Sequence, residues 1–371
     1  MGLRTAQACR AALPGLVLGL LVSSLSAHSV TFNPAVNYVV GPNPYSVVVA
    51  DFNGDGKLDV AATSSLGNEV SILLGNGDGT LQPAVYYPVA ETPRHLTTAD
   101  FNKDGKADLA VADAKSGDVS ILLGKGDGTF QPAVNIPVNI PSPYGIAAAD
   151  FNKDGNVDLA VTAVLGQTVA LMLGNGNGTF QAPVKFLAGV QPDSIAVADL
   201  NHDGNLDMAI TNFGSDNVSV LLGKGNGSFK AAVNYPAGDG AMSIVAGDFN
   251  HDGRLDLAAA NHNAGTVTML LGMGDATYRA GNTYTTGGYS KRLATADLTG
   301  NGNLDLVIPN FLSSNVSVLM GNGDGTFQPE ITLLADQGPT CAAIADLDRD
   351  GKLDLVITNM TSGTVSVLIQ N

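Results

Sequence analysis

The chain has 371 residues, of which 44% are hydrophobic, enough to bury a sizeable core, and 45 are glycine, which favours many tight turns. Its formal charge of −16 excludes a typical nucleic-acid binder, because phosphate contacts need clustered Lys and Arg. Two cysteines, Cys9 and Cys341, are too few for a disulfide framework.

The N-terminus has the pattern of a secretory signal peptide. Arg4 and Arg10 supply positive charge, residues 11–25 are apolar, and small residues follow as far as Ala27. An uncleaved anchor is the alternative, but the apolar run is shorter than the ~20 residues of a spanning helix. We therefore expect residues 1–27 to be removed, no membrane span elsewhere, and a secreted or cell-surface protein, extracellular or periplasmic.

One short motif, Asp-x-polar-x-polar-Gly-x-apolar-Asp, recurs seven times after the N-terminal segment. Its copies are spaced by 49 or 50 residues. They begin at Asp51, Asp100, Asp150, Asp199, Asp248, Asp297 and Asp346. Such even spacing indicates a repeat architecture and leaves no room for a second domain, so residues 28–371 are predicted to form one domain.

Each unit contains four short strand patterns and no helical pattern. In the first unit the apolar runs are residues 45–50, 58–63, 70–74 and 81–87. A four-stranded sheet repeated at this period is typical of a propeller blade. The predicted fold is therefore all-β, a seven-bladed β-propeller of four-stranded blades.

The two ends of the chain predict how the ring closes. The last unit stops after its third strand pattern, and the missing fourth pattern stands at the N-terminus, where residues 31–38 resemble residues 129–136. We predict that residues 31–39 form the outer strand of the last blade, which hides the edges that an open array would expose.

The repeated motif carries ligands of the type that calcium prefers. In the first copy Asp51, Asn53 and Asp55 alternate, Gly56 permits a sharp turn, and Asp59 closes the loop. Calcium takes six to eight hard oxygen ligands, which this spacing can bring together. The start matches an EF-hand loop, but strand patterns flank it where helices would be needed, so we predict a calcium loop within a β-hairpin.

The remaining six copies repeat this ligand set. The seventh is the most acidic, and the sixth has only two carboxylates, which predicts weaker binding or an empty site there. About six or seven structural calcium ions are expected, and magnesium is disfavoured because it rarely uses all-protein cages. Plain polar β-turns are the alternative. The predicted ligands are Asp100, Asn102, Asp104, Asp108, Asp150, Asn152, Asp154, Asp158, Asp199, Asn201, Asp203, Asp207, Asp248, Asn250, Asp252, Asp256, Asp297, Thr299, Asn301, Asp305, Asp346, Asp348, Asp350 and Asp354.

A second candidate site lies six residues before each motif, at the start of the inner strand. This position varies in chemistry between the repeats, whereas the framework positions hardly change. The variation indicates either a specialised surface near the channel mouth, opposite to the calcium loops, or neutral drift. The predicted ligand-binding residues at this position are Tyr45, Arg94, Tyr144, Asp193 and Lys291, and the neighbouring His95 and Arg292 are added to them.

The repeated unit resembles a known family. The pattern Asp-Phe-Asn-x-Asp-Gly-x-x-Asp-Leu-Ala-Val, with Leu-Leu-Gly-x-Gly-Asp-Gly-Thr-Phe, is similar to FG-GAP/VCBS repeats and to the integrin α-subunit propeller. The resemblance covers nearly all of residues 28–371. It implies a seven-bladed propeller with calcium in its inter-strand loops, usually extracellular and often in adhesion or glycan binding.

Three hypotheses for the function remain open. The first is a monomeric, non-enzymatic binding, adhesion or scaffold module for an extracellular glycan or protein, favoured because no nucleophile elbow or zinc-ligand spacing is present. The second is a carbohydrate-active enzyme such as a polysaccharide lyase, which needs a base beside a charge-neutralising group. His95 with Arg94, or Tyr144 with Lys291, could supply that pair. The third is a structural surface-layer element.

Overall fold

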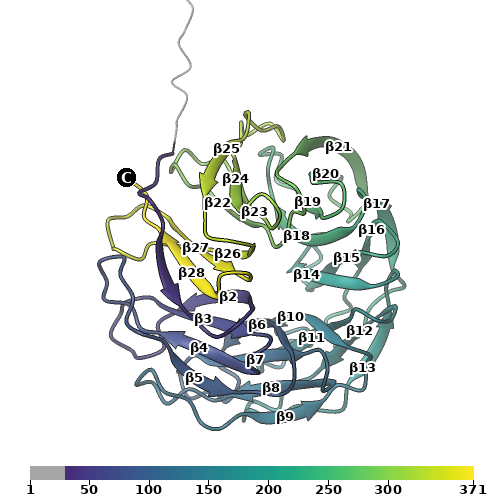
Figure 1. The fold of residues 1–371 in the computed structure, drawn as a ribbon. Coiled ribbons are helices and arrows are strands. Elements are labelled where there is room, and N and C mark those ends of the chain that lie inside the picture. The colour runs from purple at the N-terminus through teal and green to yellow at the C-terminus, as the bar shows by residue number, and fades with distance from the viewer. Residues whose placement is uncertain (1–29) are drawn as a thin grey trace, which may run out of the picture.

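The computed structural model describes residues 30–371, which form a closed ring of seven four-stranded antiparallel sheets (Figure 1). The predicted all-β, seven-bladed propeller is confirmed. The predicted signal peptide, residues 1–27, and Cys9 lie outside the described residues. In the described part of the chain no helix is long and apolar enough to cross a membrane.

Each blade runs outwards through four consecutive strands. The innermost strands are β2 (Pro44–Ala50), β6 (Pro93–Ala99), β10 (Pro143–Ala149), β14 (Pro192–Ala198), β18 (Ala241–Gly247), β22 (Ala294–Ala296) and β26 (Pro339–Ala345). The second strands are β3 (Asp59–Ser64), β7 (Asp108–Asp113), β11 (Asp158–Ala163), β15 (Asp207–Asn212), β19 (Asp256–Asn261), β23 (Asp305–Asn310) and β27 (Asp354–Asn359).

The outer two positions complete the blades. The third strands are β4 (Glu69–Leu73), β8 (Asp118–Leu122), β12 (Thr168–Met172), β16 (Asn217–Leu221), β20 (Thr266–Gly272), β24 (Asn315–Leu319) and β28 (Thr364–Leu368). The outermost strands are β5 (Val85–Pro88), β9 (Val134–Pro137), β13 (Val184–Leu187), β17 (Val233–Pro236), β21 (Tyr278–Thr285), β25 (Ile331–Leu334) and β1 (Val36–Val39).

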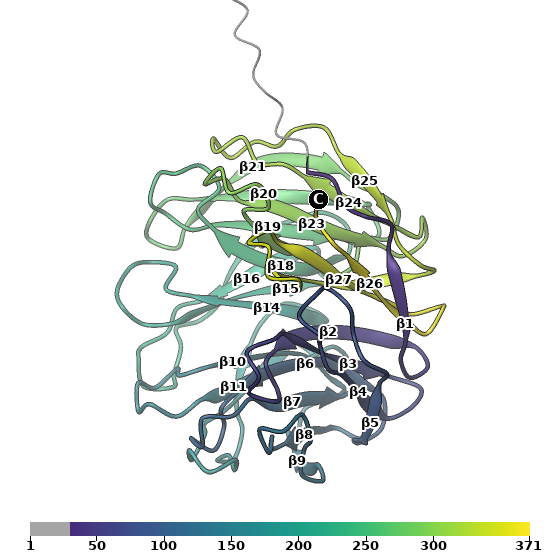
Figure 2. The same cartoon turned by 90° about the vertical axis from the view of Figure 1, so that its left-hand side faces the viewer.

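The N-terminal strand closes the ring, as predicted. Strand β1 pairs antiparallel with β28, with Val36 opposite Val367, and an isolated bridge between Phe32 and Gln370 extends the contact. The side view shows β1 beside the C-terminal strands of the last blade (Figure 2). The last blade therefore contains strands from both ends of the chain, and β28 does not remain as an unpaired edge strand.

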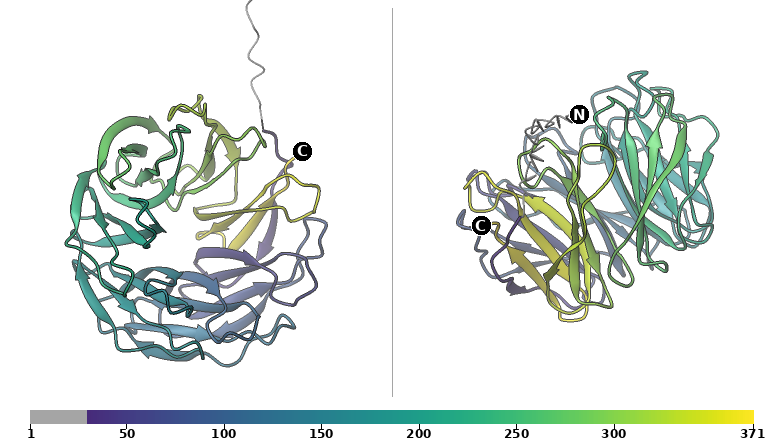
Figure 3. Two further views of the ribbon diagram at one scale, coloured as in Figure 1. Left: turned by 180° about the vertical axis from the view of Figure 1, so that it is seen from behind. Right: turned by 90° about the horizontal axis from the view of Figure 1, so that it is seen from above.

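The hydrophobic core lies between the blades, whose sheets face one another around the ring (Figure 3). Every residue of β3 is buried, which explains its nearly continuous apolar sequence, whereas the outermost strand β5 is largely exposed. One core cluster joins Phe52 and Ile72 of the first blade to Leu109 and Phe130 of the second. Each interface is therefore built from two successive repeats.

Aromatic pairs and the Gly-rich turns join successive blades. Phe52 packs edge-on against Phe130, with ring centroids 5.5 Å apart, and the N–H of Gly128 donates to the carbonyl of Phe52 over 3.0 Å. The same aromatic pairing recurs between Phe101 and Phe180, Phe151 and Phe229, and Phe249 and Phe327. The motif that carries the predicted calcium ligands thus also carries the contact with the next blade.

The sixth blade departs from the regular pattern. Its inner strand β22 has three residues, whereas the other inner strands have seven. The preceding segment bonds partly outside its own sheet, because Arg292 N–H donates to the carbonyl of Thr340 in the seventh blade over 3.0 Å. The inner edge of the sixth blade is therefore held partly by a backbone hydrogen bond to the seventh blade.

Candidate functional site

Each predicted calcium loop folds around its own carboxylates. In the first loop Asp51 Oδ1 accepts from Gly54 N–H over 2.7 Å, and Asp51 Oδ2 accepts from Gly56 N–H over 2.8 Å. Asn53 Oδ1 accepts from Asp55 N–H over 2.9 Å. These side-chain-to-backbone bonds wrap the chain around Asp51.

The seventh loop provides a direct test of whether the residues fit a cation. Carboxylate oxygens of Asp346, Asp348 and Asp354 all lie within 4.8 Å of one another. Asp346 Oδ1 is buried and has no hydrogen-bond partner. Three clustered carboxylates with an unpartnered oxygen repel one another, and a hard divalent cation would relieve that repulsion. The donor set therefore fits calcium.

The closing aspartate of the motif has a structural role that the sequence reasoning missed. Asp59 is fully buried; its Oδ2 accepts from Phe52 N–H and its Oδ1 from Gly75 N–H, each over 2.8 Å. It thereby clamps the loop to the turn between the third and fourth strands. The equivalent pairs of bonds are made by Asp108, Asp158, Asp207, Asp256, Asp305 and Asp354.

Burial and neighbouring carboxylates make these closing aspartates hard to ionise. Burial, with a smaller effect from Asp154 and Asp150, raises the pKa of Asp158 to about 6 despite two backbone hydrogen bonds. The pKa of Asp256 is raised to about 6 for the same reasons. A cation in the loop would favour the charged form of these carboxylates.

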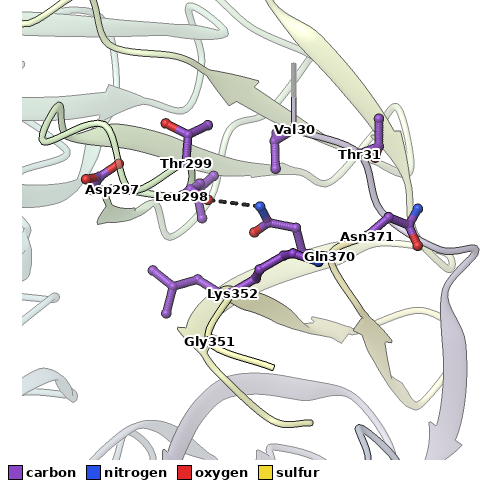
Figure 4. Close-up of a pocket in the computed structure, with 11 residues that line it drawn as sticks. Val30, Thr31, Asp297, Leu298, Thr299, Gly351, Lys352, Gln370 and Asn371 are labelled. Atoms are coloured by element: carbon purple, nitrogen blue, oxygen red, sulfur yellow. Dashed lines mark hydrogen bonds between the residues drawn. The ribbon is translucent and has the colours of Figure 1, made fainter. Parts of the chain in front are cut away.

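The sixth loop lies beside a hollow of about 450 Å³ at the seam between the last two blades (Figure 4). Gln370 crosses the seam, and its Nε2 donates to the carbonyl of Leu298 over 2.9 Å. Thr299 Oγ1, which replaces a carboxylate or amide oxygen of the other loops, is buried without a partner. Asp297 still accepts from Gly302 N–H over 2.6 Å, so the loop keeps the shape of the others.

The second predicted site is brought together at the other end of the inner strands. Each of the first four inner strands contains a β-bulge, in which Tyr45 and Ser46, for example, both stand opposite Thr63. Bulges re-aim side chains and are frequent at functional sites. The bulges lie in inner strands, which surround the centre of the ring (Figure 1), and these strands and the segment before β22 bring one group of residues together. We call it the axial cluster: Tyr45, Arg94, His95, Tyr144, Asp193, Lys291 and Arg292.

Aromatic contacts join three blades within the axial cluster. The phenolic oxygens of Tyr45 and Tyr144 are in direct contact. His95 packs edge-on against both rings with centroid distances of 5.1 Å, and the Arg94 guanidinium lies 4.9 Å from the centroid of Tyr45. Burial raises the pKa of Tyr45 to about 12 and, helped by the nearby cations, lowers the pKa of His95 well below its usual value. The histidine is therefore a neutral imidazole.

Charged groups complete the axial cluster. Asp193 is buried, and burial raises its pKa to about 7 although Arg292, Lys291 and Arg94 act to lower it. Burial lowers the pKa of Lys291, whose ammonium lies 5.4 Å from the ring centroid of Phe311. Within residues 30–371 the ion pairs closer than 4.0 Å are four exposed ones, and none includes a residue of the axial cluster.

Hydroxyl bridges between inner strands support this arrangement. Thr162 Oγ1 accepts from Gly145 N–H and donates to the carbonyl of Asp193, both over 2.8 Å. Thr63 joins the first two blades in the same way through Ser46 N–H and the carbonyl of Arg94. The recurrent Thr in the second strand is the sequence signal that could have identified these bridges.

The FG-GAP-like repeat model matches residues 51–111, 100–161, 163–210, 206–259, 248–308 and 310–357, most of the chain. The chain belongs to the FG-GAP-like repeat family. No match was found among the curated proteins.

Solved structures share the fold of this FG-GAP-like repeat protein at low sequence identity. BBS1N, solved in complex with ARL6DN, has a TM-score of 0.65 at 14% identity, over 91% of this chain and 96% of that chain. Virginiamycin B lyase from Staphylococcus aureus has a TM-score of 0.65 at 13% identity, over 91% and 99% of the two chains. An Agrocybe aegerita lectin that recognises terminal N-acetylglucosamine has a TM-score of 0.57 at 19% identity, over 89% and 96%. At these identities the likeness concerns the fold alone.

Proposed function

We propose that this protein is a secreted, calcium-binding propeller that acts as a binding or adhesion module for an extracellular glycan or protein. The observation that carries the proposal is the separation of two specialised ends. Repeated oxygen-rich loops occupy one end of the inner strands, and the axial cluster occupies the other. The loops are alike in all blades because they stabilise the framework. The residues of the axial cluster differ from blade to blade because they bind a ligand.

Calcium in this proposal has a structural task. Asp51, Asn53, Asp55 and their equivalents would hold the ion, which supplies positive charge to a chain whose formal charge is −16. The unpartnered Asp346 Oδ1 supports this assignment most directly. Filling the loops would stiffen the end of the ring where the Gly-rich turns connect successive blades.

The axial cluster has the composition of a recognition site. It combines Tyr45, Tyr144 and His95 with Arg94, and aromatic and Arg side chains are enriched at the energetic centres of interfaces. Related folds also host ligand binding: BBS1N was solved with ARL6DN, and the Agrocybe aegerita lectin recognises N-acetylglucosamine. These ligands belong to those proteins, and the proposal takes from them only that a propeller supports binding.

The test is a binding screen of residues 28–371 in calcium against immobilised glycans and extracellular matrix proteins. The wild type is compared with Tyr144→Ala and with the matched control Tyr86→Ala on the outermost strand β5. The proposal expects a ligand that Tyr144→Ala loses and Tyr86→Ala keeps. Ordered self-association without any ligand would contradict it and favour the surface-layer alternative.

A polysaccharide lyase is the second candidate, because the axial cluster places a buried imidazole beside a guanidinium. Both ring nitrogens of His95 lack hydrogen-bond partners, and Arg94 is the adjacent residue. In such a β-elimination the neutral imidazole would take the proton from the carbon next to a substrate carboxylate that Arg94 neutralises. The electron pair would form the C=C bond as the neighbouring glycosidic C–O bond breaks, and the leaving oxygen would take up a proton. Incubation with uronate polysaccharides separates the candidates. New ultraviolet absorbance from an unsaturated product that disappears in His95→Gln would favour the enzyme.

A further inference from the structure

The axial cluster has more positive than negative charge, in contrast to the chain as a whole. Arg94, Lys291 and Arg292 face a single carboxylate, that of Asp193, whereas the chain carries a formal charge of −16. Gathering three cations in a partly buried place costs free energy through mutual repulsion and desolvation. Such an arrangement calls for a compensating negative group that the described side chains do not provide.

Several polar atoms of the axial cluster are buried without a partner. They are both ring nitrogens of His95, Asp193 Oδ1, and the Nε atoms of Arg94 and Arg292. His95 and Asp193 are only 1% and 2% exposed. Buried polar groups are nearly always hydrogen-bonded, so this concentration in one place indicates a missing partner.

The cations of the axial cluster form no direct ion pair with Asp193. The charges of Arg292, Lys291 and Arg94 all act on Asp193, yet no nitrogen of these side chains lies within 4.0 Å of its oxygens. An oxyanion can accept hydrogen bonds from guanidinium, ammonium and imidazole groups together. The planar guanidinium fork suits carboxylate and sulfate geometry in particular.

We propose that the axial cluster is a binding site for an oxyanion, a carboxylate or sulfate group, held by Arg94, Lys291 and Arg292. A free inorganic ion and the acidic group of a sugar are the two sources of such an anion, and they share the same recognition chemistry. The proposal rests on the proposed binding function and adds the ligand class. His95 donates one hydrogen bond, and Tyr45 and Tyr144 form the aromatic wall beside the anion.

Asp193 gives the proposal a distinctive consequence. Its carboxylate repels an anion, so Asp193→Asn should tighten anion binding several-fold by removing one like charge. A cluster with a purely structural purpose would behave differently. There Asp193→Asn would only remove the single counter-charge of three cations and destabilise the fold, with no anion bound at all.

The experiment is isothermal titration calorimetry of residues 28–371 in calcium. D-glucuronate is compared with neutral D-glucose, and inorganic sulfate is titrated alone and as a competitor. The double variant Arg94→Gln/Lys291→Met is compared with Lys115→Met, a control whose side chain is 70% exposed and pairs only with Glu91. The melting temperature of each variant is recorded to confirm folding.

We expect sulfate to bind, and glucuronate to bind at least about tenfold more tightly than glucose if the anion is borne by a sugar. The double variant should lose anion binding while Lys115→Met keeps it. Sulfate binding without glucuronate binding identifies a free ion as the ligand and still supports the site. Absence of both, or binding that survives in the double variant, overturns the proposal, and the wild-type comparison remains decisive if the double variant does not fold.

The same measurements separate this proposal from the proposed function. A glycan or protein ligand together with no anion binding by the wild type would support the binding module and refute the oxyanion site. Anion binding without any glycan or protein ligand would support the site and refute the module.

Discussion

The phenolic oxygens of Tyr45 and Tyr144 touch although the two residues belong to blades that are not neighbours. His95, from the blade between them, packs edge-on against both rings. Three successive blades therefore meet through side chains at the centre of the ring. A substitution at one of these positions changes the surroundings of the other two, so the axial cluster behaves as one unit.

Removing one of the two hydroxyls should measurably weaken the fold. Tyr144→Phe deletes the buried contact with Tyr45 and keeps both rings, so we expect a loss of about 1 kcal/mol in the free energy of unfolding. Tyr86→Phe on β5, where the side chain is 45% exposed, is the matched control and should change little. Urea unfolding measures both, and equal effects would contradict a specific role for the Tyr45 contact.

Two variants in the fourth predicted calcium loop separate metal binding from the structural role of the closing aspartate. Asp207 accepts from the N–H groups of Leu200 and Gly223 over 2.9 and 2.7 Å. An amide nitrogen cannot accept these bonds, so Asp207→Asn should lower stability by roughly 2 kcal/mol in EDTA, and by more in calcium because a ligand is weakened as well. Asp203→Asn keeps an oxygen that can accept from Asn205 N–H, and should lower stability only in calcium.

Thermal unfolding of the two variants in each condition completes this comparison. If Asp203→Asn destabilises the protein equally in EDTA, the loop residue acts through the fold and not through a metal ion. If Asp207→Asn has no effect in EDTA, the clamp contributes nothing of its own.

Asp113 is a buried acid at the end of a second strand, where four other blades have an asparagine. Its Oδ2 accepts from the N–H and hydroxyl of Ser120, and its Oδ1 has no partner. Four other blades have Asn at this place, and their amide nitrogens donate to the equivalent hydroxyl. Those residues are Asn212, Asn261, Asn310 and Asn359.

Replacing Asp113 by Asn should stabilise the protein at neutral and alkaline pH. Burial raises the pKa of Asp113 from 3.8 to about 7, so the folded state binds the proton more tightly than the unfolded state. Its contribution to stability is therefore present at low pH and is lost as pH rises towards 7. The gain from Asp113→Asn should approach roughly 2 to 4 kcal/mol above pH 7.

Chemical unfolding of wild type and Asp113→Asn across this pH range measures the difference, which cancels the contributions of the other acids. The difference should grow from the unfolded pKa of 3.8 up to about 7 and then stay constant. A difference that does not change with pH would refute the titration of Asp113 as its cause.

The contact of Phe130 with the first blade should tolerate leucine, because leucine stands at the equivalent position of another repeat. Phe130 is 4% exposed and packs against Phe52 and Tyr87. Phe130→Ala should cost about 3 to 5 kcal/mol through lost burial and a cavity. Phe130→Leu places there the residue that Leu81 supplies in the first blade, and should cost much less. Equal losses in urea unfolding would show that the aromatic ring itself is required.

The repeat allowed most of the fold to be predicted, because each blade is specified locally by its own strands and turns. Closure by residues 31–39 could be predicted because Phe32 and its neighbours carry the pattern of a fourth strand. Cys341 is a buried free thiol in β26, which agrees with a count of cysteines too low for a disulfide framework.

Other features depend on relations between blades that a single repeat does not contain. The β-bulge at Tyr45 is defined by the register with β3, and the segment before the short strand β22 bonds to Thr340 in the next blade. The backbone hydrogen bonds of Asp59 were not predicted, because calcium binding alone was enough to explain an aspartate at this position of the motif. The variation of one position between the repeats predicted the residues of the axial cluster. Only the structure shows that Asp193 and Arg94 lie near each other.

Calcium stoichiometry with thermal unfolding tests the central claim most directly. Residues 28–371 are freed of metal with EDTA, calcium is restored, and bound calcium is counted while the unfolding midpoint is followed. Because an ion that binds only the folded state raises the midpoint by mass action, the account predicts a large calcium-dependent rise with about six or seven ions bound per chain. An unchanged midpoint with no bound calcium would contradict it and leave the loops as hydrogen-bonded turns.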